Sequence, residues 1–220
     1  MRVIQILPQL NIGGVERGTL DLSKALIEQG HESFVISGGG ILVDELIRSG
    51  AKHYEIPVHI KSLRTLYLAK SLSEKISSID PDIVHIRSRM PAWVNYRAFK
   101  MLKKKPLLIS TFHGLYSFPI YSKVMSFVDH SIAISKTVER YILENYRLDK
   151  DDITVIPRGC DPIEFNNNVI NPADKANIIE EFPQIVGKKV LTIPGRITKW
   201  KGVAEFIELL SLLDDNYHGL

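Results

Sequence analysis

Short apolar runs alternate with longer stretches of helical periodicity along most of this 220-residue chain. Seven runs rich in β-branched residues are predicted to be strands, at residues 3–7, 33–37, 53–56, 83–87, 107–112, 131–134 and 154–157. Helices are expected between them, at residues 16–29, 43–48, 63–78, 93–103, 121–127 and 136–145. This alternation predicts a parallel sheet whose strands are joined by crossover helices. Several of the strands are continuously apolar, such as the run from Ile83 to Ile86, so helices should cover both faces of the sheet. The fold class is therefore expected to be α/β, with a doubly wound parallel sheet.

The pattern fades between Pro162 and Lys189, where a run of three asparagines and Pro172 indicates a linker or an irregular excursion. A strand at 190–193 and an amphipathic helix at 203–213 follow. We therefore expect an amino-terminal domain at 1–165, a linker at 166–189, and at 190–220 the truncated start, one βα unit, of a second Rossmann-like domain. One such unit is far short of the roughly 100–150 residues of a typical domain.

Composition narrows the class of protein. With 45% hydrophobic and 24% charged residues the chain is globular, and its formal charge of +3 gives no reason to expect a nucleic-acid partner. The single cysteine, Cys160, excludes an internal disulfide framework and is expected to be a small buried residue in a reducing compartment. No stretch approaches the roughly 20 apolar residues of a spanning helix, so we expect a cytoplasmic protein.

A glycine pair, Gly13-Gly14, follows the first predicted strand and precedes a helix. Glycines at this place let backbone N–H groups approach a phosphate or a sugar closely. A nicotinamide dinucleotide site would need G-x-G-x-x-G here and an acidic residue at the end of the second strand, and neither is present. The alternative is a tight turn that binds nothing.

Basic side chains follow two further strands. His113 comes after the fifth strand, where it could donate a hydrogen bond to a sugar hydroxyl or could simply cap a loop. Arg87 and Arg89 come after the fourth, beside Trp93. The two guanidinium groups could hold an acceptor phosphate or carboxylate while the indole covers a sugar face, or they could belong to a solvated helix start.

The second βα unit carries the most informative spacing in the chain, Gly195-Arg196 followed by Lys201-Gly202. Its strand–turn–helix context places Arg196 and Lys201 near a helix amino terminus, where cations and the helix dipole favour a diphosphate.

No metal site is expected. The Asp-x-Asp pairs at Asp80 and Asp149 precede their strands, so they should be turn residues at the edge away from ligands. The run of three lysines from Lys103 ends a helix, as a solvated terminus or as a membrane-surface contact.

Together these motifs resemble the retaining GT-B glycosyltransferases of family 4. The resemblance runs through most of the chain, and its motifs are Gly13-Gly14-Val15-Glu16, Gly30-His31-Glu32, Pro81-Asp82-Ile83-Val84-His85, Phe112-His113-Gly114, Ile134-Ser135, Ile156-Pro157-Arg158-Gly159-Cys160-Asp161 with Phe165, Gly195-Arg196 and Lys201-Gly202. The segments at 88–93 and 194–202 are most similar to bacterial lipopolysaccharide-core enzymes, mannosyltransferases among them. A Glu-x7-Glu motif, which the family uses for the donor sugar, is absent from the 220 residues.

This resemblance implies a cytoplasmic enzyme, peripheral at the inner membrane, that transfers a hexose from a nucleotide-diphosphate sugar such as GDP-mannose to a lipid-linked saccharide, without metal or other cofactor. His113, Arg196 and Lys201 would be catalytic, and Gly13, Gly14, Glu16, Arg87, Arg89 and Arg158 would bind donor or acceptor. The chain would be a truncated or split form. The alternatives are an inactive remnant that binds a glycan or a partner chain, and a sugar-nucleotide epimerase.

Overall fold

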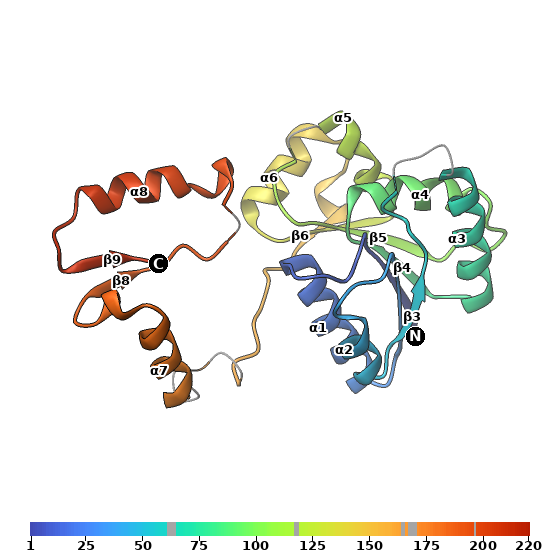
Figure 1. The fold of residues 1–220 in the computed structure, drawn as a ribbon. Helices are drawn as coiled ribbons and strands as arrows, with labels where there is room; N and C mark the ends of the chain where they lie inside the picture. The colour runs from blue at the N-terminus through green and yellow to red at the C-terminus, as the bar shows by residue number, and fades with distance from the viewer. Residues whose placement is uncertain (61–64, 117–118, 164–165, 167–170, 196) are drawn as a thin grey trace. The chain divides into compact units, whose positions relative to one another are not determined.

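The structure is a computed structural model that describes residues 1–60, 65–116, 119–163, 166, 171–195 and 197–220 (Figure 1). It divides into two compact units, Met1–Arg158 and Gly159–Leu220.

The first unit is built on a parallel sheet of seven strands in the order β3-β2-β1-β4-β5-β6-β7. The strands are β1 (Arg2–Ile6), β2 (Glu32–Ser37), β3 (Lys52–Glu55), β4 (Ile83–Ile86), β5 (Leu107–Phe112), β6 (His130–Ala133) and β7 (Ile153–Val155). The order reverses at β1, which lies between β2 and β4. The expected doubly wound α/β fold is thereby confirmed, and the reversal marks where such sheets bind ligands.

The helices of this unit lie close to the ranges that periodicity predicts, and α4 and the range 121–127 differ most. They are α1 (Gly14–Glu28), α2 (Val43–Arg48), α3 (Thr65–Ile79), α4 (Arg89–Phe99), α5 (Pro119–Ser122) and α6 (Lys136–Asn145), with short 3₁₀ turns η1 (Lys123–Ser126) and η2 (Lys150–Asp152). The expected start of α3 at residue 63 falls outside the described residues. Helix α4 begins and ends four residues earlier than expected, so the lysine run from Lys103 follows the helix instead of ending it. Pro91 is accommodated in the first turn of α4, where a proline removes no helical hydrogen bond. The helix expected at 121–127 is the short α5 continued by η1.

Apolar side chains cover both faces of the sheet. On one face Ile4 and Ile36 pack in a cluster with Leu72 and Ile76 of α3. On the other face Val35 belongs to a smaller cluster with Leu20 of α1 and Leu46 of α2. Each fully buried side chain of this size contributes about 1.5–3 kcal/mol to stability. The continuously apolar strands are thus explained, because alternate residues of one strand enter different clusters.

The second unit contains α7 (Pro172–Glu181), η4 (Pro183–Ile185), β8 (Lys189–Leu191), η5 (Lys199–Lys201), α8 (Val203–Ser211) and β9 (Tyr217–Gly219). Strands β8 and β9 pair in parallel, so the unit holds a βαβ arrangement instead of the single βα unit expected. The range 166–189, expected to be a linker, contains helix α7. This helix has a clear start, because Asn171 caps it by accepting a hydrogen bond from the Ala173 amide at 3.0 Å, and proline favours the first helical position. The division after Arg158 also precedes the expected boundary at residue 165.

None of the helices within the described portion of the chain is long and apolar enough to cross a membrane.

Candidate functional site

The candidate site lies at the carboxyl-terminal edge of the seven-stranded sheet. Gly13 and Gly14 come after β1, Arg87 directly follows β4, His113 directly follows β5, and Arg158 comes after β7. Because all these strands are parallel, the residues that follow them meet at one edge.

The glycine loop is held by Arg158. Nη2 of Arg158 donates a hydrogen bond to the carbonyl oxygen of Gly14, although the two residues are 144 positions apart in the sequence. The half-buried Glu16 turns back over the loop, so that a Cβ at Gly13 would collide with its carboxylate. Space above Gly14 is open, since a Cβ there would meet no atom of the described chain within 4 Å. The loop is therefore held by Arg158, while the Cβ position of Gly14 is open.

Gly18 belongs to the same arrangement and was missed in the sequence. It lies in α1 four residues after Gly14, on the same helical face. A Cβ at Gly18 would collide with the Arg158 guanidinium, so only glycine leaves that side chain its place. A glycine inside a helix lowers stability by about 1 kcal/mol relative to alanine. A glycine inside the predicted helix at 16–29 is therefore unfavourable for the helix, and this could have identified Gly18 in the sequence.

Arg87 is buried, in contrast to the solvated helix start considered as its alternative. Only 6% of the residue is exposed, and its Nη1 donates to Oε1 of Gln5 at 2.9 Å. Gln5 in turn donates to the carbonyl oxygen of Thr19 at 3.1 Å and to Oγ of Ser23 at 2.9 Å, both in α1. Nε of Arg87 is buried without a hydrogen-bond partner among the described residues. Burial, and then the nearby Arg158, lower the Arg87 pKa to about 10, so the group remains a cation near neutral pH.

His113 is held as a neutral imidazole. Burial is the main cause that lowers its pKa to about 3, and the charges of Arg87 and Arg158 add to it. Nδ1 lies 3.5 Å from Nη1 of Arg158. Because a guanidinium only donates, a histidine bonded in this way carries its proton on Nε2. Nε2 is itself buried without a partner in the described part of the chain, so the site offers one unused N–H donor.

A row of polar residues lies on the α1 side of the sheet beneath these groups. Gln5 and His85 are register partners on β1 and β4, and Nε2 of His85 lies 2.7 Å from Oγ1 of Thr111 on β5. Burial, then Arg87, hold the pKa of His85 well below its usual value. Gln5 and His85 were missed as site residues. The sequence signal that could have identified them is a polar residue within an apolar strand. Because side chains alternate between the two faces of a strand, His85 lies on the same face as Arg87, and Thr111 on the same face as His113.

Arg89 and Trp93 lie in an aromatic cluster at the start of α4. The Arg89 guanidinium lies 4.7 Å from the ring centre of Tyr116 and 5.7 Å from that of Tyr121. Trp93 packs against Tyr96 and Tyr121, and its Nε1 donates to the Tyr121 carbonyl oxygen at 3.0 Å. The indole of the half-buried Trp93 thus contacts the protein through its N–H and these two rings.

The basic pair of the second unit is described only in part. Arg196 lies outside the described residues. Lys201 ends η5, one residue before the start of α8, so it lies near a helix amino terminus as expected. Carbons of its side chain lie 3.7 Å from a Cβ built on Gly195. Gly202 has φ +76°, a left-handed conformation that favours glycine.

The acidic pairs and the cysteine complete the set of sequence candidates. Asp80 precedes β4 and forms ion pairs with Arg2 at 3.1 Å and Lys104 at 2.7 Å, so it is a structural turn residue as predicted. Among the residues that the structure describes, no three acidic, histidine or cysteine side chains are grouped to hold a metal ion.

Cys160 is exposed, which corrects the expectation that it is buried. Cys160 belongs to the second unit, in which no described residue is buried.

The doubly wound sheet, with a glycine turn after its first strand, defines a Rossmann-like domain. A family model described as Glycosyltransferase Family 4 matches residues 12–164, and the chain belongs to this family.

Known proteins agree with this assignment. The chain is 36% identical to a solved glycosyltransferase from Rickettsia africae ESF-5, with a TM-score of 0.78 over 97% of this chain and 57% of that one. Anabaena Alr3699/HepE, solved in complex with UDP and glucose, is 16% identical with a TM-score of 0.81, over 100% of this chain and 60% of that one, and it shares the GT-B-like fold. A human protein named as one of the subunits of phosphatidylinositol N-acetylglucosaminyltransferase is 25% identical over 77% of this chain and 38% of its own length.

The chain thus spans little more than a third of the human relative and less than two thirds of these solved neighbours.

Proposed function

We propose that this chain is the acceptor-side part of a retaining GT-B glycosyltransferase. It transfers a hexosyl group from a nucleotide-diphosphate sugar to a lipid-linked saccharide, at a cytoplasmic site that is peripheral to the inner membrane. The observation that carries the proposal is the neutral His113, whose unused Nε2–H lies at the ligand edge with the glycine loop, Arg87 and Arg158. An uncharged N–H donor suits a sugar hydroxyl, and fixed guanidinium charges suit phosphate.

The names of relatives support the same class of reaction. The human relative is named for N-acetylglucosaminyl transfer to phosphatidylinositol, and a neighbour of the same fold was solved with UDP and glucose. A lipid-linked acceptor and a nucleotide-sugar donor follow for this chain as parts of the proposal. Within that class we propose GDP-mannose as the first donor to try and a lipopolysaccharide core as the acceptor.

Each residue has a proposed role. The backbone of Gly13 and Gly14 approaches the donor diphosphate, with Glu16 and Arg158 fixing the loop. His113 donates to the transferred sugar, and Arg89 contacts the acceptor. Arg87 acts from within as a buried positive charge. Arg196 and Lys201 of the second unit neutralise the departing diphosphate, so that the charge developing in the transition state meets cationic side chains without a metal ion.

The first test is release of nucleoside diphosphate from GDP-mannose, UDP-glucose and UDP-N-acetylglucosamine by the purified chain, with and without a lipid-linked saccharide. We expect acceptor-dependent release that survives a chelator and is lost in His113→Ala. Release that needs no acceptor would indicate the epimerase, and abolition by the chelator would refute the metal-independent step.

A second test concerns truncation. We propose that the chain is a truncated or split form, so a reading frame that continues past codon 220 into a Glu-x7-Glu motif would support it. Glycan binding with no turnover of any donor, by this chain and by that longer product, would favour the inactive remnant.

A further inference from the structure

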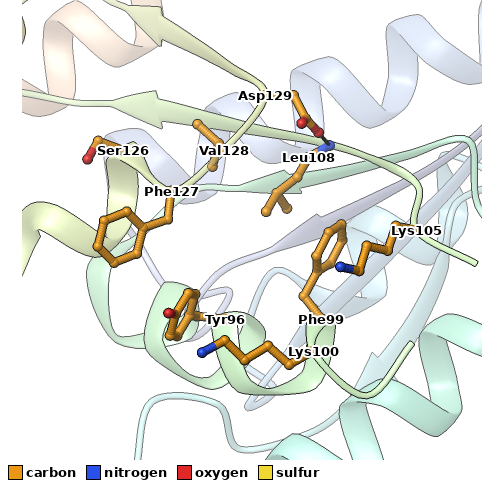
Figure 2. A pocket seen from close by; sticks show the side chains of 9 residues that line it. All are labelled: Tyr96, Phe99, Lys100, Lys105, Leu108, Ser126, Phe127, Val128 and Asp129. Carbon is orange, nitrogen blue, oxygen red and sulfur yellow. Dashed lines mark hydrogen bonds between the residues drawn. The ribbon is translucent and has the colours of Figure 1, made fainter. Parts of the chain in front are cut away.

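A crevice opens at the amino-terminal edge of the first unit's sheet, the edge opposite the candidate site. It has a volume of about 350 Å³, within the roughly 300–1,000 Å³ typical of ligand pockets. The last turns of α4, the start of β5 and the segment between η1 and β6 form its walls (Figure 2). None of its lining residues belongs to the site proposed for sugar transfer.

Aromatic rings form much of the crevice wall. Tyr96 and Phe99 come from α4, Phe127 from the opposite segment, and the buried Leu108 lies between them in the view of Figure 2. Phe127 is 39% exposed, and the rings of Tyr96 and Phe127 lie 5.3 Å apart. Aromatic surface left open to water in a concave site favours a ligand with a planar or apolar portion.

Two lysines also line the crevice, Lys100 and Lys105. The ammonium of Lys100 lies 4.2 Å from the ring centre of Tyr96. Among the ion pairs between described residues neither lysine has a carboxylate partner, whereas their neighbour Lys104 is paired with Asp80. The one acidic lining residue, Asp129, uses Oδ2 to accept a hydrogen bond from the Leu108 amide at 2.8 Å. The crevice therefore carries an excess of positive charge beside its rings.

We propose that this crevice is a second binding site, which takes a small soluble organic anion with an aromatic or apolar portion. The rings contact that portion, and Lys100 and Lys105 bind the anionic group. A lipid bilayer with anionic headgroups would also present apolar and anionic groups together. It is disfavoured if the proposed function holds, because a membrane bound at this edge would lie on the far side of the sheet from a lipid-linked acceptor.

The test uses anilinonaphthalene sulfonate, an aromatic anion, titrated into the full chain and followed by two-dimensional amide NMR. We expect the largest shifts at Leu108, Val128 and Asp129, which line the crevice. The double variant Lys100→Gln/Lys105→Gln should bind roughly ten-fold more weakly, the loss expected when about 1.4 kcal/mol of charge-assisted contact is removed. Inorganic phosphate alone should bind less tightly than the aromatic anion.

Lys103→Gln is the control for net charge, because it removes one positive charge from an exposed lysine nearby that does not line the crevice. If this control weakens binding as much as the double variant does, the effect is one of net charge and the proposal fails. Shifts confined to the second unit, whose apolar side chains are exposed, would also overturn it. So would tight binding of phosphatidylglycerol vesicles, lost in the double variant, with no shift from the soluble anion. Sugar transfer is not the readout, so failure here leaves the proposed function untouched.

Discussion

The charge of Arg87 acts on the histidines around it. Its side chain is nearly excluded from water, and Asp21 and Glu16 raise its pKa by less than burial and Arg158 lower it. A cation in such surroundings acts more strongly on its neighbours than a solvated one. His113 is the neighbour whose protonation matters most for the proposed chemistry.

We expect Arg87→Met to raise the pKa of His113 from about 3 while leaving it below the ordinary 6.5, because burial remains its largest cause. NMR titration of the His113 imidazole measures this directly and needs no activity. Arg97→Met, at an exposed position of α4, is the control and should change nothing. An unshifted His113 in a folded Arg87→Met protein would show that the charge of Arg87 does not reach the ring.

The neutral His113 also makes the chain sensitive to acid. Between pH 6.5 and about 3 the unfolded chain binds a proton at this residue that the folded chain does not. The free energy of unfolding should therefore fall as the pH is lowered through this window. Urea denaturation at a series of pH values gives the free energy of unfolding at each pH. Plotted against pH in this window, that free energy should change less steeply for His113→Gln than for the parent protein. Parallel curves would contradict a folded-state pKa as low as this.

Gly18→Ala should separate stability from activity. Alanine is the better helix former by about 1 kcal/mol, so α1 itself should not be weakened. The added Cβ, however, displaces the Arg158 guanidinium and with it the hydrogen bond to the Gly14 carbonyl. We expect an unchanged or higher Tm with at least a roughly ten-fold loss of kcat/KM in the transfer assay, the loss that corresponds to about 1.4 kcal/mol.

A double-mutant cycle controls this result. In an Arg158→Met background, Gly18→Ala should cause no further loss, because the group it displaces is already gone. Additive losses would mean that Gly18 acts through something other than Arg158.

At the scale of elements, a start signal by itself does not make a helix predictable from the sequence. Helix α6 has the expected bounds, and its cap, Ser135, accepts a hydrogen bond from the Val138 amide at 3.2 Å. Helix α7 was missed although Asn171 and Pro172 give the same kind of start signal. The difference lies in packing, because α6 buries Val138 and Ile142, whereas α7 has no buried residue and so shows no strong apolar stripe.

Ser135→Ala should accordingly lower the free energy of unfolding of the first unit by about 1 kcal/mol, the usual cost of a lost amino-terminal cap. Denaturant unfolding followed by circular dichroism measures it. Ser78→Ala serves as the control, because this exposed serine near the end of α3 donates to the Lys75 carbonyl oxygen in the preceding turn and does not cap a helix start. An equal effect at both positions would show that capping is not the cause.

At the scale of the whole molecule, the two units differ in burial. The first has two apolar clusters, whereas no described residue of the second is buried. In α8, Ile207 is 63% exposed and Leu209 47%. Local opening should therefore cost less free energy in the second unit.

Limited digestion with trypsin should cut first in the second unit, at Lys175, Lys188 or Lys189. A resistant fragment that ends near Arg158 should remain, and mass spectrometry of the time course identifies both. If the second unit persists as long as the first, its apolar side chains are covered by another protein surface in solution.

Much of the fold was predictable because it depends on local patterns. Apolar runs and helical periodicity indicated every strand of the large sheet, and strand composition indicated that both faces are covered. Strand β9 was missed because three residues, Tyr217–Gly219, carry no period that can be recognised, and it exists only by pairing with β8.

The candidate site was predictable only as far as strand ends could be located. That placed Gly13, His113 and Arg87 at one edge of the sheet, because parallel strands all end there. The sequence by itself thus determined the α/β class, the ligand edge and the residues that reach it. Only the tertiary structure decided that Arg87 is buried against Gln5, that Arg158 binds Gly14, and that His113 is neutral. The physical reason is that burial and pKa depend on contacts between residues far apart in the chain, as the sequence separation of 144 between Gly14 and Arg158 illustrates.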